Sequence, residues 1–181
     1  CIEDILRSRN VIIDDFGESP TCVYRLQNDE ESLYLKVVQK GFESTTYSVE
    51  REKSVIAWLS NQLRVPEIVE FSETEKHQFL VMKSVSGDRL CDIEVPESQF
   101  VSYFSDAVKK VQSIPVRSCR FNSDFDIRLS ELKFLIESDL AAREDLLEGD
   151  VPFDNPRELY DHLMDTKPSE HLVFSHGDMS D

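Results

Sequence analysis

The sequence predicts an α+β protein in two lobes, because the expected elements change type once along the chain. Short β-favouring runs separated by turn residues fill most of the first half, and runs with helical periodicity fill the second. Strands first and helices afterwards are typical of the α+β class. The polar run Ser84–Gly87 separates the two parts. We therefore expect a sheet-containing lobe over residues 1–84 and a mostly helical lobe over residues 85–181.

The first lobe is expected to hold an antiparallel sheet and one helix. Residue types and flanking turns predict five strands, at Val11–Ile13, Cys22–Leu26, Ser32–Val38, Ile68–Phe71 and His77–Met82. Short turns join the first three, which predicts a meander. A helix is predicted from Ser48 to about Leu63, because its apolar residues repeat with helical spacing before Val65-Pro66 ends it. The residues of this apolar stripe are Val49, Ile56, Leu59 and Leu63.

The second lobe is expected to consist of helices. One predicted helix has an apolar face made of Phe100, Phe104, Val108 and Val111. A less regular stripe on a second consists of Ile127, Leu132, Leu135 and Ile136. A third predicted helix, Arg157–Met164, follows Asn155-Pro156, which is a favourable helix start.

Composition and charge restrict the partners. The chain has 36 acidic and 20 basic residues, and its net charge of −16 repels nucleic acid and anionic membranes. It has no apolar run near the length of a membrane span, and its N-terminus lacks the features of a signal peptide. We expect a soluble, cytoplasmic protein that binds neither nucleic acid nor membranes. The four cysteines are too scattered to indicate a zinc site or a disulfide framework.

Two charged residues occupy positions expected to be apolar. Strand alternation places Lys36 on one face with Tyr34 and Val38, and Glu52 lies on the apolar stripe of the predicted helix. One interpretation is that strand and helix pack together and the two charges pair, since a lone buried carboxylate is costly. The other is that Lys36 extends to water at a sheet edge while Glu52 lies on the helix rim. Phosphate binding would explain a pair, because kinases fix a strand lysine with a helix glutamate.

Three further features fit a nucleotide site. Ser19, in the turn between the first two strands, can offer its hydroxyl and amide to a phosphate, although the turn lacks GxGxxG and equally resembles an ordinary turn. Tyr34 shares the face of Lys36 and can stack on a purine, although a lone tyrosine is at least as often a core residue. The run Leu80–Val85 can expose backbone groups to an adenine edge.

A local excess of acid follows the second predicted helix. Seven acidic residues and one base, Arg143, lie in this run, and the acids are Glu137, Asp139, Glu144, Asp145, Glu148, Asp150 and Asp154. Such an excess suits a polycation. Acidic composition also serves solubility, so charge by itself does not establish this partner.

A candidate catalytic residue lies in the stretch FSHGDMSD at 174–181, which follows an apolar run. A carboxylate in such a loop can orient an acceptor hydroxyl and take its proton in phosphoryl transfer, which makes Asp178 the candidate. His176 is expected to support the loop through hydrogen bonds. HGD alone is weak. Its order after a strand lysine, a helix glutamate and the run Ser84–Gly87, which we interpret as a hinge between the lobes, strengthens the prediction.

Taken together, several stretches resemble the aminoglycoside phosphotransferases of the 3′ class, the kanamycin kinases. They are GESPTCVYRL (17–26), LYLKVV (33–38), TTYSVEREKSVIAWL (45–59), DIRLSELKFL (126–135), PFDNPRELYDHL (152–163) and LVFSHGDMSD (172–181). The resemblance implies a bilobal protein-kinase-like fold whose helical lobe is incomplete here. It also implies ATP-dependent transfer of the γ-phosphate to the 3′-hydroxyl of an aminoglycoside antibiotic of the kanamycin or neomycin type, which confers resistance.

The resemblance implies a role for each matching residue around the nucleotide. Lys36 would hold the α- and β-phosphates of ATP, Glu52 would fix that lysine, and Ser19 would cover the phosphates. Tyr34 would stack on adenine. The remaining implied positions are Lys83 and Val85, for backbone contacts to the base, and Asp178, for catalysis.

Substrate and metal binding follow from the same resemblance. Glu148, with Asp145 and Glu144 nearby, would bind the antibiotic, although Leu146 stands where a polar residue is expected. The Mg²⁺ ligands of the family would lie beyond Asp181, so we expect none within this chain and no phosphate transfer by these 181 residues alone. Two other functions stay open: a kinase of the same fold acting on choline or homoserine, and a non-catalytic nucleotide-binding fragment.

Overall fold

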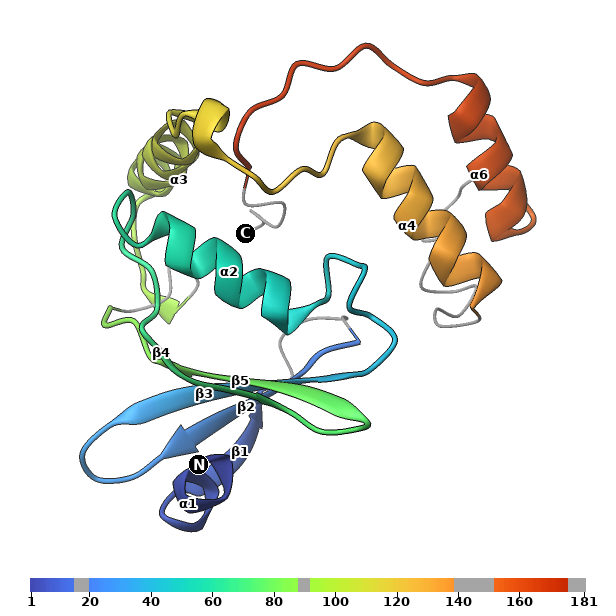
Figure 1. Cartoon of the computed structure of the whole chain (residues 1–181). Coiled ribbons are helices and arrows are strands. Elements are labelled where there is room, and N and C mark those ends of the chain that lie inside the picture. The colour runs from blue at the N-terminus through green and yellow to red at the C-terminus, as the bar shows by residue number, and fades with distance from the viewer. Residues whose placement is uncertain (15–19, 88–91, 139–151, 176–181) are drawn as a thin grey trace. The chain divides into compact units, whose positions relative to one another are not determined.

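The computed structural model describes residues 1–14, 20–87, 92–138 and 152–175. The chain divides into two compact units, Cys1–Ile93 and Glu94–Asp181. The first contains a five-stranded sheet, and the regular elements described in the second are helices (Figure 1). The predicted α+β class is therefore confirmed, while the lobe boundary after residue 84 stays a prediction.

All five predicted strands are present in the first unit. They are β1 (Asn10–Asp14), β2 (Cys22–Gln27), β3 (Ser32–Gln39), β4 (Ile68–Glu73) and β5 (His77–Lys83). The strand order is β1-β2-β3-β5-β4, and every neighbouring pair is antiparallel. The predicted meander of the first three strands is confirmed. The position of β5 between β3 and β4 was not predicted.

One face of the sheet carries a hydrophobic cluster covered by a short helix. Leu26, Leu33, Leu35 and Val81 are buried together, and helix α1 (Ile2–Arg7) packs Ile2, Ile5 and Leu6 against them. Sequence reasoning missed α1 because six residues are too few for a clear periodic signal. The available signal was the spacing of Ile2, Ile5 and Leu6, which share one face of a helix.

The opposite face of the sheet is covered by α2 (Val49–Leu59), which contacts β3, β4 and β5 (Figure 1). The buried residues of α2 are Val49, Ile56 and Leu59, as predicted. The helix ends four residues earlier than expected, and the amides of Gln62 and Leu63 turn back to the Leu59 carbonyl at 2.7 and 2.9 Å. Ser60 and Asn61 favour this early end, because such side chains compete with helical hydrogen bonding.

The second unit contains α3 (Glu97–Gln112), the 3₁₀ turn Val116–Ser118, α4 (Phe125–Glu137) and α6 (Pro156–Asp165). The predicted face of α3 is its half-buried one, where Phe100 and Phe104 stack at 6.5 Å. The stripe predicted for α4 is partly wrong. Leu135 is buried, but Ile127 is exposed, and the other buried residues of α4 are Leu129 and Glu131. Glu131 is accommodated there by an ion pair with Arg128.

Helix α6 begins as its sequence predicted. The Asn155 side chain accepts a hydrogen bond from the Glu158 amide at 3.1 Å, and Pro156 occupies the first turn, where a missing N–H costs nothing. Helix α6 contacts α4 within the second unit.

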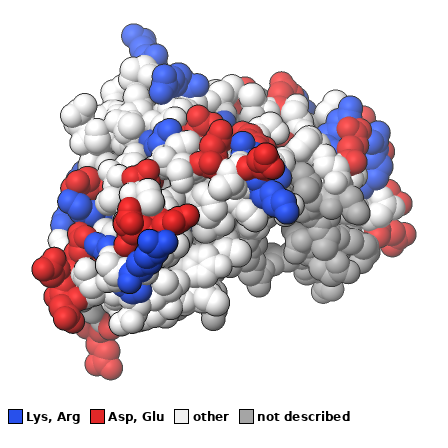
Figure 2. Space-filling view, turned by 60° about the horizontal axis from the view of Figure 1, so that its bottom comes forward, with Lys and Arg blue, Asp and Glu red and all other residues white. Residues whose placement is uncertain are grey.

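Two surface properties bear on possible partners. No helix among the described residues has both the length and the hydropathy needed to cross a membrane. Acidic and basic side chains lie among one another on the face shown in Figure 2. The chain has a net charge of −16, but its acidic side chains do not form a single patch on that face.

Candidate functional site

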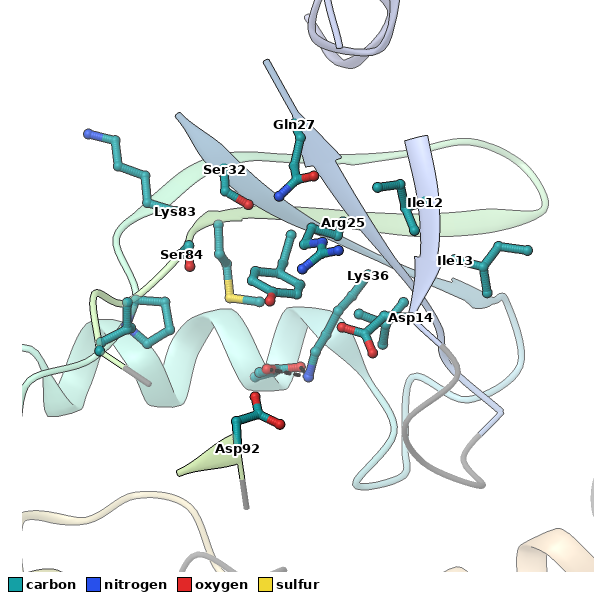
Figure 3. Close-up of a pocket in the computed structure, with 17 residues that line it drawn as sticks. Ile12, Ile13, Asp14, Arg25, Gln27, Ser32, Lys36, Lys83, Ser84 and Asp92 are labelled. Atoms are coloured by element: carbon teal, nitrogen blue, oxygen red, sulfur yellow. Dashed lines mark hydrogen bonds and ion pairs between the residues drawn. The ribbon is translucent and has the colours of Figure 1, made fainter. Parts of the chain in front are cut away.

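A pocket of about 1030 Å³ opens on the α2 side of the sheet (Figure 3). Its lining comes from four strands, from Glu52 on α2, from Pro66 before β4, and from the segment after β5, all within the first unit. This volume suits a small organic ligand. Of the residues singled out in the sequence, the pocket brings together Tyr34, Lys36, Glu52, Lys83 and Val85.

An ion pair between strand and helix forms one wall of the pocket. The Lys36 Nζ lies 2.8 Å from Oε1 and 3.0 Å from Oε2 of Glu52, and the two side chains are 30% and 32% exposed. The predicted pair is thus present, and Lys36 does not simply extend to water. An ammonium has three N–H donors. Lys36 therefore keeps capacity for a ligand while Glu52 fixes its direction.

The segment before α2 fixes the position of Glu52. The Ser48 side chain caps α2 by accepting from the Arg51 amide at 3.3 Å, and the Ser48 carbonyl accepts from the Glu52 amide at 3.0 Å. Just upstream, the buried Thr45 hydroxyl donates to the Phe42 carbonyl at 2.8 Å. These bonds tie the first turn of α2, and with it Glu52, to a buried anchor.

Tyr34 lies on the same face of β3 as Lys36. They are two positions apart, which corresponds to about 7 Å along a strand. Tyr34 is half-buried, and its cross-strand partners are Arg25 on β2 and Met82 on β5. An aromatic ring one strand repeat from a fixed ammonium provides adjacent surfaces for a flat base and an anion.

The chain leaving β5 presents backbone rather than charge to the pocket. The Lys83 side chain extends away to Glu67, at 2.8 Å, and this hydrogen bond raises the pKa of Lys83 (Figure 3). The Lys83 and Ser84 amides donate to the carbonyls of Glu67 and Ser32. In the part of the chain that the structure describes, no hydrogen bond uses the Val85 amide, which leaves that donor for a ligand.

Several pocket residues were missed in the sequence. Arg25, Asp14 and Asp92 line the pocket, and none was singled out. Alternation on β2 places Arg25 and Val23 on the same face, but only the pairing of Val23 with Lys36 in the structure shows that this is the pocket face. Asp14 and Asp92 required knowledge of how β1 and the segment after β5 approach the same space.

Five predicted site residues lie outside the described residues: Ser19, Glu144, Asp145, Glu148 and Asp178. Within the described ranges, no group of three or more His, Cys, Asp or Glu side chains is arranged to hold a metal ion. Among the described residues, the candidate functional groups are therefore those of the pocket around Lys36.

Fold and site together define the class. A five-stranded antiparallel sheet with a strand lysine paired to a helix glutamate is the nucleotide-binding arrangement of kinase-like phosphotransferases. The chain belongs to the phosphotransferase enzyme family, which it matches over residues 13–181.

The chain is similar in sequence to several curated proteins of one kind. The chain is 36% identical over 185 residues to an aminoglycoside 3'-phosphotransferase of Enterococcus faecalis and 37% identical over 185 residues to one of Staphylococcus aureus. Each match spans 99% of this chain and 70% of the relative. An enzyme of the same name from Campylobacter jejuni is 38% identical over 166 residues, which are 91% of this chain and 66% of that relative. The resemblance to this family is thereby confirmed.

Solved structures support the fold. An aminoglycoside-3'-phosphotransferase of type VIII has a TM-score of 0.72 at 20% identity, and the match covers 93% of this chain and 64% of that one. The phosphotransferase APH(3'')-Id from Streptomyces rimosus, in complex with ADP and streptomycin, has a TM-score of 0.63 at 20% identity and coverages of 91% and 60%. The chain thus spans less than two thirds of these structures. The kinase-like fold is confirmed.

Proposed function

We propose that the protein is an ATP-dependent phosphotransferase that moves the γ-phosphate to the 3′-hydroxyl of an aminoglycoside antibiotic of the kanamycin or neomycin type and so confers resistance. The observation that carries the proposal is the Lys36–Glu52 pair beside Tyr34 in a pocket of ligand size. The names of the curated relatives support the substrate class.

The proposed nucleotide roles combine the family resemblance with the geometry of the pocket. Lys36, fixed by Glu52, binds the α- and β-phosphates of ATP, and Tyr34 stacks on adenine. The Val85 amide and the Lys83 backbone contact the edge of the base, because the Lys83 side chain is directed to Glu67. Ser19, which lies outside the described residues, covers the phosphates in this proposal on the basis of the resemblance. Magnesium is the proposed metal cofactor, and it would supply positive charge to stabilise the phosphate groups in transfer.

The proposed acceptor site rests on residues outside the described ranges. Asp178 orients the sugar hydroxyl and accepts its proton, and Glu144, Asp145 and Glu148 attract the cationic antibiotic. We also place the enzyme in the cytoplasm, where ATP is available.

The test compares acceptors in the full-length protein. We expect kanamycin to be phosphorylated and to stabilise the protein in thermal-shift measurements, whereas choline and homoserine should do neither. Phosphorylation of choline or homoserine alone would reassign the substrate. ATP binding without transfer to any acceptor, at every magnesium concentration, would instead indicate a non-catalytic nucleotide-binding protein.

Asp178→Asn tests the catalytic role separately. Asparagine keeps the shape and one hydrogen bond but loses the basicity, so turnover should fall about 10²-fold or more while ATP affinity changes little. Steady-state kinetics with kanamycin measure both. Turnover within a factor of about two of the wild type would remove Asp178 from the mechanism, since asparagine is an equally good turn residue.

A further inference from the structure

We infer that Arg25 is a second cation of the nucleotide site and contacts the phosphate chain of the nucleotide beside Lys36. The inference rests on the proposed function and extends it to a residue for which the sequence predicted no role. It follows from the strand register, the charge environment of Arg25 and the donor geometry of a guanidinium group.

The register places Arg25 on the pocket face. Val23 lies opposite Lys36 and Arg25 lies opposite Tyr34, so Arg25 and Lys36 are diagonal neighbours on adjacent strands. Such neighbours lie about 7–8 Å apart, which long side chains can span. In Figure 3, Arg25 and Lys36 extend from β2 and β3 into the same space.

Arg25 lacks a protein partner in the part of the chain that the structure describes. It makes no ion pair, side-chain hydrogen bond or ring contact there, although it is half-buried. Several other arginines among the described residues form ion pairs: Arg9 with Glu31, Arg128 with Glu131 and Arg157 with Asp161. A partly desolvated guanidinium without a counter-ion is unfavourable, which indicates that an anionic ligand completes its environment.

The acidic residues of the pocket do not supply that counter-ion. Glu52 is engaged by Lys36 through both carboxylate oxygens. Asp14 lies opposite Val23 and is therefore diagonal to Arg25, but no ion pair joins the two. Asp92 lines the pocket and has interactions of its own, none of them with Arg25.

The position of Arg25 favours phosphate rather than base. With adenine over Tyr34 and phosphates at Lys36, the guanidinium lies beside the path between them. Arginine presents up to five N–H donors in a planar fork that fits two phosphate oxygens at once, whereas Lys36 acts as a point charge. Two cations on adjacent strands would thus hold one phosphate chain from two directions.

The experiment measures the dissociation constants of ATP, ADP and adenosine for full-length Arg25→Gln, Arg25→Lys and the wild type. We expect Arg25→Gln to weaken ATP and ADP about tenfold, because charged hydrogen bonds to phosphate are lost, and to leave adenosine within about twofold. Arg25→Lys should recover part of the loss. Arg7→Gln is the matched control, because it removes one charge from an exposed ion pair on α1, outside the pocket.

The outcomes separate this inference from the proposed function. Equal weakening of adenosine would show that Arg25 supports the base or the fold, and unchanged ATP and ADP would show that it binds no phosphate. If Asp14→Asn, added to Arg25→Gln, restored ATP affinity, Arg25 would serve only to neutralise Asp14. Any of these results overturns the inference but leaves the function intact, whereas a wild type that binds no ATP overturns the function itself.

Discussion

Lys36 combines two properties that a phosphate ligand requires, namely a fixed direction and unused donor capacity. Lys36→Ala should abolish ATP-dependent phosphorylation while the protein stays folded, because the side chain is about one third exposed and its loss leaves no deep cavity. Circular dichroism tests whether the variant stays folded, and a phosphate-transfer assay tests whether phosphorylation is lost. Wild-type turnover in the variant would refute the phosphate role.

The controls for Lys36 are a neighbouring lysine and its partner. Lys40→Ala removes a charge that is paired with Glu73 and does not line the pocket, so turnover should remain near that of the wild type. Glu52→Gln should lower turnover less than Lys36→Ala, because an amide oxygen still accepts from the ammonium. A larger loss in Glu52→Gln would mean that the carboxylate has a function beyond orientation.

The site residues that the sequence predicted best are those whose charge conflicted with an apolar pattern. Lys36 and Glu52 stood at such positions, and the structure pairs them. Arg25 was not predicted, because an arginine on a short strand breaks no apolar pattern. Only the strand register shows that it shares the pocket face with Lys36. Asp14 and Asp92 depend on chain segments converging in space, and residue spacing does not encode that.

The N-terminal cap of helix α2 affects both the stability of the fold and the position of Glu52 in the pocket. Ser48→Ala removes the side-chain acceptor for the Arg51 amide, which should cost about 1 kcal/mol of unfolding free energy. Because Glu52 lies in the first turn of α2, the KM for ATP should also rise. Denaturant titration and kinetics test both effects. Ser60→Ala, at the exposed opposite end of α2, is the control and should change neither appreciably.

Helix α4 carries a pH-dependent cap. The Ile127 amide donates to Asp124 at 2.9 Å, and this bond holds the pKa of Asp124 below its usual 3.8. A depressed folded-state pKa stabilises the fold above the usual pKa, and the contribution is lost as the pH falls through the lower folded value. The difference in melting temperature between wild type and Asp124→Asn should therefore shrink under acid. A difference that stays constant with pH would contradict this.

Elements with a strong period were predictable, and those defined by packing were not. Five strands and the apolar faces of α2 and α3 followed from alternation and helical spacing. The stripe of α4 was wrong at Ile127, because its true buried face includes Glu131, a charged residue that no hydrophobic period would include. Helix α1 is recognisable mainly through its contacts with the buried cluster around Leu33.

The whole molecule carries 16 more negative than positive charges, and the two proposed substrates have opposite signs. A polycationic antibiotic is attracted by this field, whereas a nucleotide must be bound against it by local cations such as Lys36. Attraction by surface charge is screened over about 8 Å at physiological ionic strength, while a partly buried ion pair is screened less. The two ligands should therefore respond differently to salt.

We expect added salt to weaken antibiotic binding steeply and nucleotide binding only slightly. Calorimetric titration of kanamycin, and separately of ADP, at low and high salt measures the two slopes. Replacing Glu144, Asp145 and Glu148 together by glutamine should flatten the kanamycin slope and leave the ADP slope unchanged, because these acids belong to the proposed antibiotic site. Equal slopes for both ligands in the wild type would show that the acidic run 137–154 is only a solvated surface, and the antibiotic site would then have to be sought elsewhere in the protein.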